Sequence, residues 1–260
     1  MFYAIKHAIR GLSRRKFKNF INMIGIVIGV SLLAGVQIAT DSLVNAMKVT
    51  VSLRYGNADI TIQNGEYVPE FFNYSVYETL VVDANLSNYI DGIAPRITSQ
   101  VSITSVFTTK QTEPFVTVIG INETLDQPFG SLTPDETYGN NDFNFTNLGD
   151  RECIIGHLLA ETVVDFDVEG EGRDEQLVLP LVSPIEMSFL DAQNNFRTLE
   201  TLRVKGVAKA EGKGILNTGY VVFMKIEYLQ DLFNTTGNDI NNIVVSTTEE
   251  NENAIYVKEL

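Results

Sequence analysis

The sequence has 260 residues, 44% of them hydrophobic and 20% charged, so the chain is long enough and apolar enough to bury a core. It carries 33 acidic and 19 basic residues, and the formal net charge of −14 excludes nucleic acid as an expected partner, because nucleic-acid binding needs a net basic face. One Cys excludes an intramolecular disulfide framework and a cysteine-rich zinc site, and two His leave few options for a histidine-based site.

The first 19 residues are basic and contain no acid, since the first acidic residue is Asp41. Basic residues recur every fourth position and apolar residues recur at spacings of three and four, which predicts an amphipathic helix on the inner surface of a membrane. A basic flank without an ordered helix is the alternative. The side chains expected to contact anionic lipid headgroups are Lys6, Arg10, Arg14, Arg15, Lys16 and Lys18.

Residues 20–40 are predicted to form a transmembrane helix. The run 20–39 carries no charge, and a helix of about 20 residues spans about 30 Å, the hydrocarbon thickness of a bilayer. A cleaved signal peptide and a buried helix of a soluble protein are the alternatives, but the run is long for either and lacks a convincing A-x-A cleavage site. The basic flank is expected to stay in the cytoplasm, which places the N-terminus inside and the acidic remainder outside the cell membrane.

Small residues recur at a spacing of four inside this predicted span. Gly25 and Gly29 form a G-x-x-x-G motif, and Ser31 and Gly35 repeat the spacing. Small side chains let a second helix approach closely, so these four residues are the candidate helix-packing positions.

The remainder of the chain predicts an α+β fold. Residues 41–56 are expected to continue the helix as a stalk, and 57–260 to form a mixed extracytoplasmic domain of two subdomains, with a candidate boundary in the polar segment 126–150. Alternating or continuous apolar runs predict strands at 58–63, 96–109, 114–121, 152–156, 176–182, 198–210, 219–224 and 241–247. Helices are predicted late in 77–91 and at 157–164 and 225–233.

Residues typical of catalytic or metal sites are scarce, so we expect no enzyme active site, no bound metal and no bound cofactor. Cys153 and His157 lie four apart, but Cys153 stands in an apolar run, which favours a buried structural thiol over a nucleophile. The carboxylates of 165–171 are dense enough for Ca²⁺, yet the EF-hand pattern is absent, and a solvated acidic turn is favoured.

Nucleotide-binding motifs are absent. The piece Glu211-Gly212-Lys213-Gly214 lacks the leading Gly and the Ser/Thr of a phosphate-binding loop. Five N-x-S/T sequons are compatible with an exposed exterior domain without proving glycosylation; they begin at Asn73, Asn85, Asn122, Asn144 and Asn234.

Three segments resemble ABC transporter permeases of the MacB/FtsX type. Residues 7–36 are similar to their opening, with Ala8 to Leu12, a basic cluster, and a first membrane helix containing Gly-Ile-x-Ile-Gly-Val at 25–30. The segment 152–163 resembles a "strand, Gly, x-x-Leu-Ala" step of the MacB-like periplasmic core domain. RVKGVAKA at 203–210 and the strand and helix that follow it resemble later parts of that domain.

The resemblance implies a permease subunit whose extracytoplasmic domain moves when a separate ABC-type ATPase binds and hydrolyses ATP, for export or for extrusion of lipoproteins, drugs or peptides. It implies three partners: the ATPase, a second permease copy and membrane lipid. Such permeases have four membrane helices, and this sequence departs from them by ending without the other three, so we expect a fragment. A single-pass, membrane-anchored binding or sensor module is the alternative, and an anchored enzyme is a weaker one.

Overall fold

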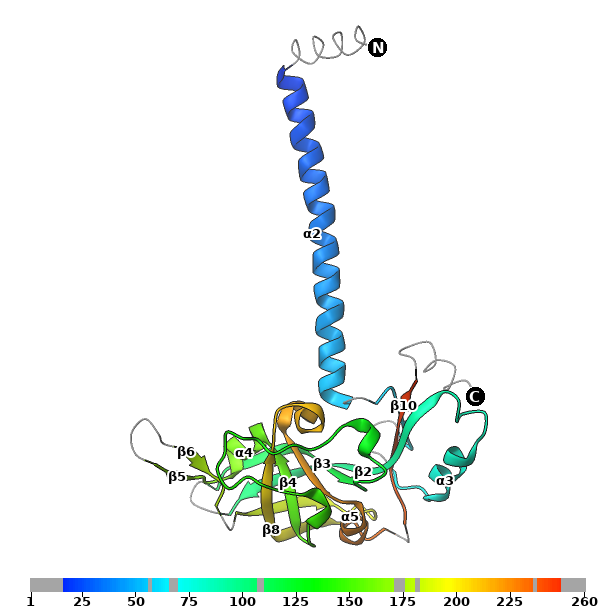
Figure 1. The fold of residues 1–260 in the computed structure, drawn as a ribbon, viewed down its shortest axis with the longest axis vertical. Coiled ribbons are helices and arrows are strands. Elements are labelled where there is room, and N and C mark those ends of the chain that lie inside the picture. The colour runs from blue at the N-terminus through cyan, green and yellow to red at the C-terminus, as the bar shows by residue number, and fades with distance from the viewer. Residues whose placement is uncertain are drawn as a thin grey trace. The chain divides into compact units, whose positions relative to one another are not determined.

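A computed structural model of the chain describes residues 16–55, 58–65, 70–106, 110–170, 176–180, 183–235 and 238–248. The chain divides into two compact units, residues 1–50 and 51–260. The first consists, in its described part, of residues 16–50 of helix α2, and the second contains a large sheet with short helices (Figure 1).

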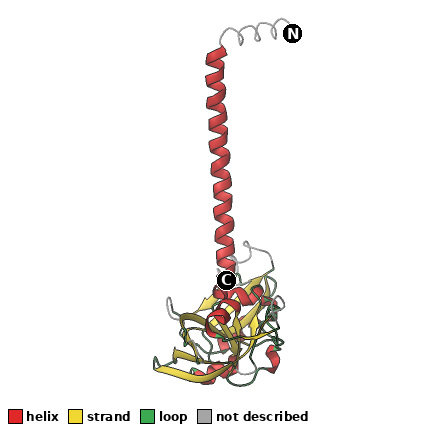
Figure 2. Ribbon diagram, turned by 90° about the vertical axis from the view of Figure 1, so that its left-hand side faces the viewer, coloured by secondary structure: helices red, strands yellow, loops and turns green. Residues whose placement is uncertain are grey.

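Helix α2 runs unbroken from Lys16 to Tyr55, through both the predicted span and the predicted stalk (Figure 2). Its segment Phe20–Met47 has a mean hydropathy of 2.1 and is long and apolar enough to cross a membrane. The apolar side chains along this segment are exposed, and Ile26 and Leu33 are each 66% exposed. The helix therefore presents an apolar surface on all sides, as expected for a segment that lipid surrounds.

The second unit is built from short elements that agree in type with most of the predicted ones. Its strands are β1 (Ile60–Gln63), β2 (Ile90–Ser105), β3 (Thr112–Ile121), β4 (Glu152–Gly156), β5 (Asp167–Glu169), β6 (Gln176–Val178), β7 (Pro184–Leu190), β8 (Phe196–Ala208), β9 (Val221–Lys225) and β10 (Asn242–Thr247). Its helices are α3 (Ser75–Val82), α4 (His157–Val163) and α5 (Ile226–Leu232), with 3₁₀ segments η1 (Gln127–Phe129), η2 (Phe145–Asn147) and η4 (Gly212–Gly219). The fold class is α+β, as predicted.

Eight strands form one sheet in the order β1-β10-β2-β3-β9-β4-β8-β7. Because β2 also pairs with β7, the six strands from β2 to β7 in this order form a closed ring of pairings. The pairs β3–β9 and β4–β8 are parallel, and the other pairings are antiparallel. Strands β5 and β6 form a separate ribbon. The segment 126–150 lies in the connection from β3 to β4, two strands of the same sheet, and the subdomain boundary proposed there stays a prediction.

The central strands are buried on both faces, which explains their continuous apolar sequence. In β4, Cys153 and Ile155 belong to the larger core cluster with α4 and α5, whereas Ile154 belongs to a second cluster on the other face. Phe145 and Leu148, from the polar segment before β4, cover that second face. The segment without periodicity is therefore packed onto the sheet through a few apolar anchors.

Several elements differ from the predicted ones. Strand β7 was missed, although buried Ile185, Met187 and Phe189 alternate with half-buried residues in the period of two that marks a strand. The predicted strand at 176–182 ends at Val178, helix α3 precedes the predicted late position, and β2 begins at Ile90. Helix α3 is fixed at its start by the side chain of Asn73, whose Oδ1 accepts a hydrogen bond from Ser75 N over 2.8 Å.

Candidate functional site

The candidate helix-packing residues lie on two stripes of α2. At about 100° per residue, Gly29 lies almost above Gly25, whereas Ser31 and Gly35 lie about two-thirds of a turn away. A Cβ added to Gly25, Gly29 or Gly35 would meet no atom within 4 Å, so these positions are open on the isolated chain. The two stripes offer small-residue surfaces to two different helices, and which of them is used stays a prediction.

Most of the candidate lipid-contacting bases lie outside the described residues. Lys6, Arg10, Arg14 and Arg15 precede α2, and Lys16 is its first residue. Lys18 is exposed in the first turns of the helix. The contact of these side chains with headgroups stays a prediction.

The Cys153 thiol is fully buried in β4, and burial raises its pKa well above the ordinary value. A thiolate is the nucleophilic form of cysteine, so this position does not supply one at neutral pH. The Nδ1 atom of His157 is buried and has no hydrogen-bond partner among the described residues. The His157 ring packs beside Gly219. The carbonyl oxygen of Gly219 also lies so close to Gly156, at the junction of β4 and α4, that a Cβ at position 156 would collide with it.

The acidic segment after α4 forms strand β5 rather than a turn. Asp167 and Glu169 are exposed, and β5 pairs with β6 through Val168 and Leu177. Among the residues that the structure describes, no group of three or more His, Cys, Asp and Glu side chains is placed to hold a metal ion.

A buried ionic cluster joins three segments that the sequence did not connect. The Asp126 carboxylate is fully buried and accepts a hydrogen bond from Arg96 Nε over 2.7 Å, while Lys213 Nζ lies 2.5 Å from its other oxygen. Lys213 also donates to the Asp126 carbonyl over 2.7 Å. Burial lowers the pKa of Lys213, and the Asp126 charge opposes that shift. The lysine of the glycine-rich piece is therefore held in an ion pair and does not face a phosphate.

The described strands leave an opening along one edge of β2. Strand β10 pairs with β2 up to Arg96, and β7 begins to pair with it at Ser102. Between these points the Asn241 side-chain amide takes the place of a strand: it accepts from Thr98 N over 2.8 Å and donates to Thr98 O over 2.9 Å. After Thr98, the next residue of β2 whose backbone N–H and C=O face this side is Gln100.

The backbone N–H and C=O of Gln100 point into this opening. Gln100 lies opposite Thr117 of β3, and Thr117 donates its own N–H to Tyr220 O over 3.0 Å, away from β2. In an antiparallel ladder, both polar groups of a residue point the same way and successive residues alternate. The backbone polar groups of Thr98 and Gln100 therefore point to the same side. Neither β10 nor β7 pairs with Gln100: the pairs of β7 with β2 stop at Ser188 and Ser102, although β7 itself continues to Leu190.

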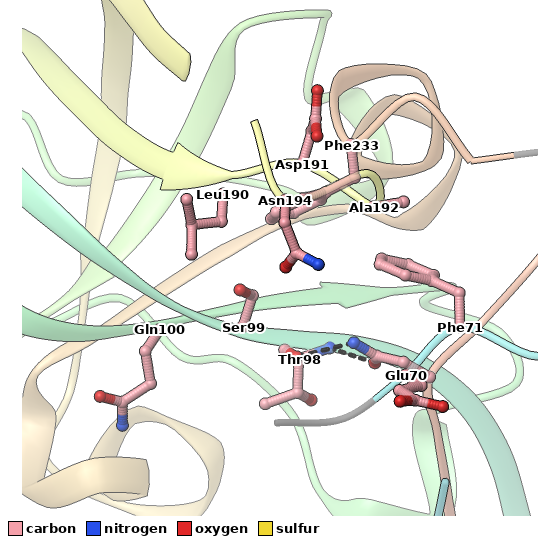
Figure 3. Close-up of a pocket in the computed structure, with 11 residues that line it drawn as sticks. Glu70, Phe71, Thr98, Ser99, Gln100, Leu190, Asp191, Ala192, Asn194 and Phe233 are labelled. Carbon is pink, nitrogen blue, oxygen red and sulfur yellow. Dashed lines mark hydrogen bonds between the residues drawn. The ribbon is translucent and has the colours of Figure 1, made fainter. Parts of the chain in front are cut away.

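The opening forms a pocket of about 490 Å³. Phe71 and Phe233 provide an aromatic end, with ring centroids 6.0 Å apart, and Leu190 provides a further apolar wall. Ser99 and Asn194 point toward one another across it (Figure 3). Among the residues that the structure describes, the arrangement combines strand-edge groups without a paired strand, apolar walls and small polar side chains, which is the composition of a binding pocket rather than of a catalytic centre.

Two carboxylates line the pocket and differ in their availability. Asp191 is buried and accepts hydrogen bonds from Asn195 and from Arg197 Nε, so its charge is already compensated. Glu70 is exposed at the rim, where it accepts a hydrogen bond from Asn64 over 3.3 Å. No sequence pattern predicted this pocket, because its walls come from five short segments spread between residues 70 and 241.

The comparison with protein families agrees with the sequence resemblance. The family model described as the MacB-like periplasmic core domain matches residues 19–259. The chain is similar to the crystal structure of the periplasmic region of MacB from Actinobacillus actinomycetemcomitans, with 12% identity, a TM-score of 0.41, and coverage of 76% of this chain and 78% of that chain. No curated protein matches the sequence.

Proposed function

Since the chain belongs to the family of the MacB-like periplasmic core domain, we propose that it is the front part of an ABC transporter permease, in which one membrane helix carries an extracytoplasmic domain. The observation that carries the proposal is the extent of the family match, which covers residues 19–259 and so includes both the apolar run of α2 and the sheet. In this proposal the N-terminus is cytoplasmic, and the bases around Lys18 contact lipid.

The proposed role is mechanical. A partner ABC-type ATPase binds and hydrolyses ATP, and the permease transmits the resulting movement to its extracytoplasmic domain, for export or for extrusion of lipoproteins, drugs or peptides. The chain itself then catalyses no reaction and binds no cofactor. A second permease copy pairs with the first through a small-residue stripe of α2, such as that of Gly25 and Gly29. The alternative, a single-pass binding or sensor module, needs no ATPase.

The test uses the full gene product together with its candidate ATPase, reconstituted in lipid nanodiscs. A spin label on Val82→Cys, at an exposed position of α3, reports the distance between the domains of two copies by pulsed electron paramagnetic resonance. The native Cys153 is fully buried and stays unlabelled in the folded domain. We expect the distance distribution to change when ATP and vanadate are added, and not with an ATPase whose phosphate-binding lysine is replaced so that it no longer binds ATP.

A distance distribution that is the same in every nucleotide state would reject the mechanical coupling. If no ATPase assembles with the protein, the single-pass module becomes the better explanation.

A further inference from the structure

We infer that the opening along β2 is a binding site for an extended segment of a separate polypeptide, which pairs with the backbone of Gln100 and places an apolar side chain against Phe71 and Leu190. This inference concerns the extracytoplasmic domain alone and does not depend on ATPase coupling.

The edge of β2 already accepts an amide in the required geometry. The Asn241 side chain forms with Thr98 the two hydrogen bonds that a neighbouring strand would form, over 2.8 and 2.9 Å. Gln100 presents the same pair of groups two residues farther along, at about 3.3 Å per residue. A peptide amide placed beside Gln100 would fill the position in the ladder between Asn241 and the first pair of β7.

The alternation of side chains in a strand decides what the pocket would contact. A ligand residue paired with Gln100 directs its own side chain to the face of Gln100, and its two neighbours point to the face of Ser99. Phe71, Leu190 and Asn194 line the pocket on the Ser99 face (Figure 3). A ligand with an apolar residue next to the paired residue would therefore bury that side chain between Phe71 and Leu190.

Charge complementarity selects a basic peptide over an acidic one. The exposed carboxylate on the rim belongs to Glu70, and the whole chain has a net charge of −14. The Arg197 guanidinium near the pocket is paired with Asp191 at 3.0 Å. An extended segment in which an apolar residue stands close to Lys or Arg is thus the ligand that the pocket fits best, through strand addition with an apolar anchor.

The experiment measures binding of a fluorescein-labelled ten-residue peptide, in which Leu alternates with Thr and Lys, to the full chain in nanodiscs by fluorescence anisotropy. We expect saturable binding with a dissociation constant below about 1 mM. A peptide with the same sequence but N-methylated backbone amides should bind at least about fivefold more weakly, because it cannot donate to the Gln100 carbonyl. Equal binding of the two peptides, or no saturable binding, would overturn the inference.

Matched variants locate the site. Leu190→Asn should weaken binding about threefold to tenfold, whereas Phe196→Asn should not, because Phe196 is the cross-strand partner of Leu190 and is exposed outside the pocket. Gln100→Pro removes the N–H that faces the opening without removing a ladder hydrogen bond, and should also weaken binding, whereas Gln100→Ala should not.

The rim charge gives a separate readout. Glu70→Gln should weaken binding of the basic peptide about twofold to fivefold at low salt and reduce its salt dependence, as expected for one exposed charge pair. The thermal unfolding midpoint of each variant shows whether its domain is folded. If a folded Leu190→Asn protein binds like the unmodified one, the peptide lies elsewhere and the site assignment is wrong.

Discussion

The side-chain amide of Asn241 satisfies both backbone polar groups of Thr98, a residue 143 positions earlier in the chain. Its Oδ1 accepts a hydrogen bond from Thr98 N over 2.8 Å, and its Nδ2 donates one to Thr98 O over 2.9 Å. Asn141 makes the same double contact with the backbone of Val207 in β8, over 2.8 Å in both directions. Two asparagines thus replace short pieces of strand where a neighbouring strand turns away. Buried backbone groups need such partners, because an unpaired one loses its hydrogen bonds to water.

Replacing Asn241 should destabilise the domain. Asn241→Leu leaves the N–H and C=O of Thr98 without partners next to a buried position, so we expect the free energy of unfolding to fall by about 1–3 kcal/mol. Urea unfolding followed by circular dichroism measures the change. Gln100→Leu is the control, because Gln100 is exposed in extended strand β2 at the same pocket and makes no side-chain hydrogen bond within the described residues. Equal stability of the two variants would contradict the role of Asn241.

Disrupting the buried ionic cluster of Arg96, Asp126 and Lys213 should lower the free energy of unfolding by more than the Asn241 substitution does. Asp126→Asn leaves Arg96 and Lys213 as two buried cations without a carboxylate, which should cost about 3–5 kcal/mol of unfolding free energy. Glu211→Gln, which removes the partner of an exposed pair with Lys209, should change stability by less than about 1 kcal/mol. Differential scanning calorimetry should therefore separate the two variants clearly; a small shift for Asp126→Asn would show that the cluster is hydrated.

Burial of Cys153 predicts a loss of stability at alkaline pH. Its pKa is raised in the folded state from an ordinary value of 9.0, so the unfolded chain releases this proton first as the pH rises. The buried thiol therefore makes its full contribution to the free energy of unfolding below pH 9.0. Above that pH the free energy of unfolding falls, relative to that of Cys153→Ala, by up to about 1.4 kcal/mol per pH unit. Unfolding of both proteins between pH 7 and pH 10 measures the difference, and parallel pH profiles would contradict it.

The small residues of α2 predict self-association in a membrane. Gly25→Ile together with Gly29→Ile should abolish pairing through that stripe, because branched side chains keep the two helices apart. The measurement is energy transfer between labelled copies of the full chain in lipid vesicles. Gly35→Ile, on the other stripe, is the matched control. Unchanged transfer in the double variant would remove Gly25 and Gly29 from the interface, and loss of transfer in the control would assign it to the second stripe.

Much of the local structure followed from the sequence. The uncharged run after the basic flank predicted the long apolar helix, because length and absence of charge are properties of the chain alone. The apolar runs of β4, β9 and β10 predicted buried strands close to their observed positions. Strand β7 was missed because Pro180 and the apolar residues before it drew the predicted strand toward 176–182, although Ile185, Met187 and Phe189 show the required alternation.

The amino-acid sequence alone was enough to predict the long apolar helix, the acidic domain that follows it, the α+β class and the resemblance to the permease family. Hydropathy, charge order and residue periodicity act over short stretches, so they can be read without knowing the fold. Tertiary structure alone decided that Asp126 lies between Arg96 and Lys213, and that Gln100 faces a pocket between β10 and β7. These relationships depend on strand order and on the point where each strand ends, and contacts between residues so far apart leave no periodic pattern in the sequence.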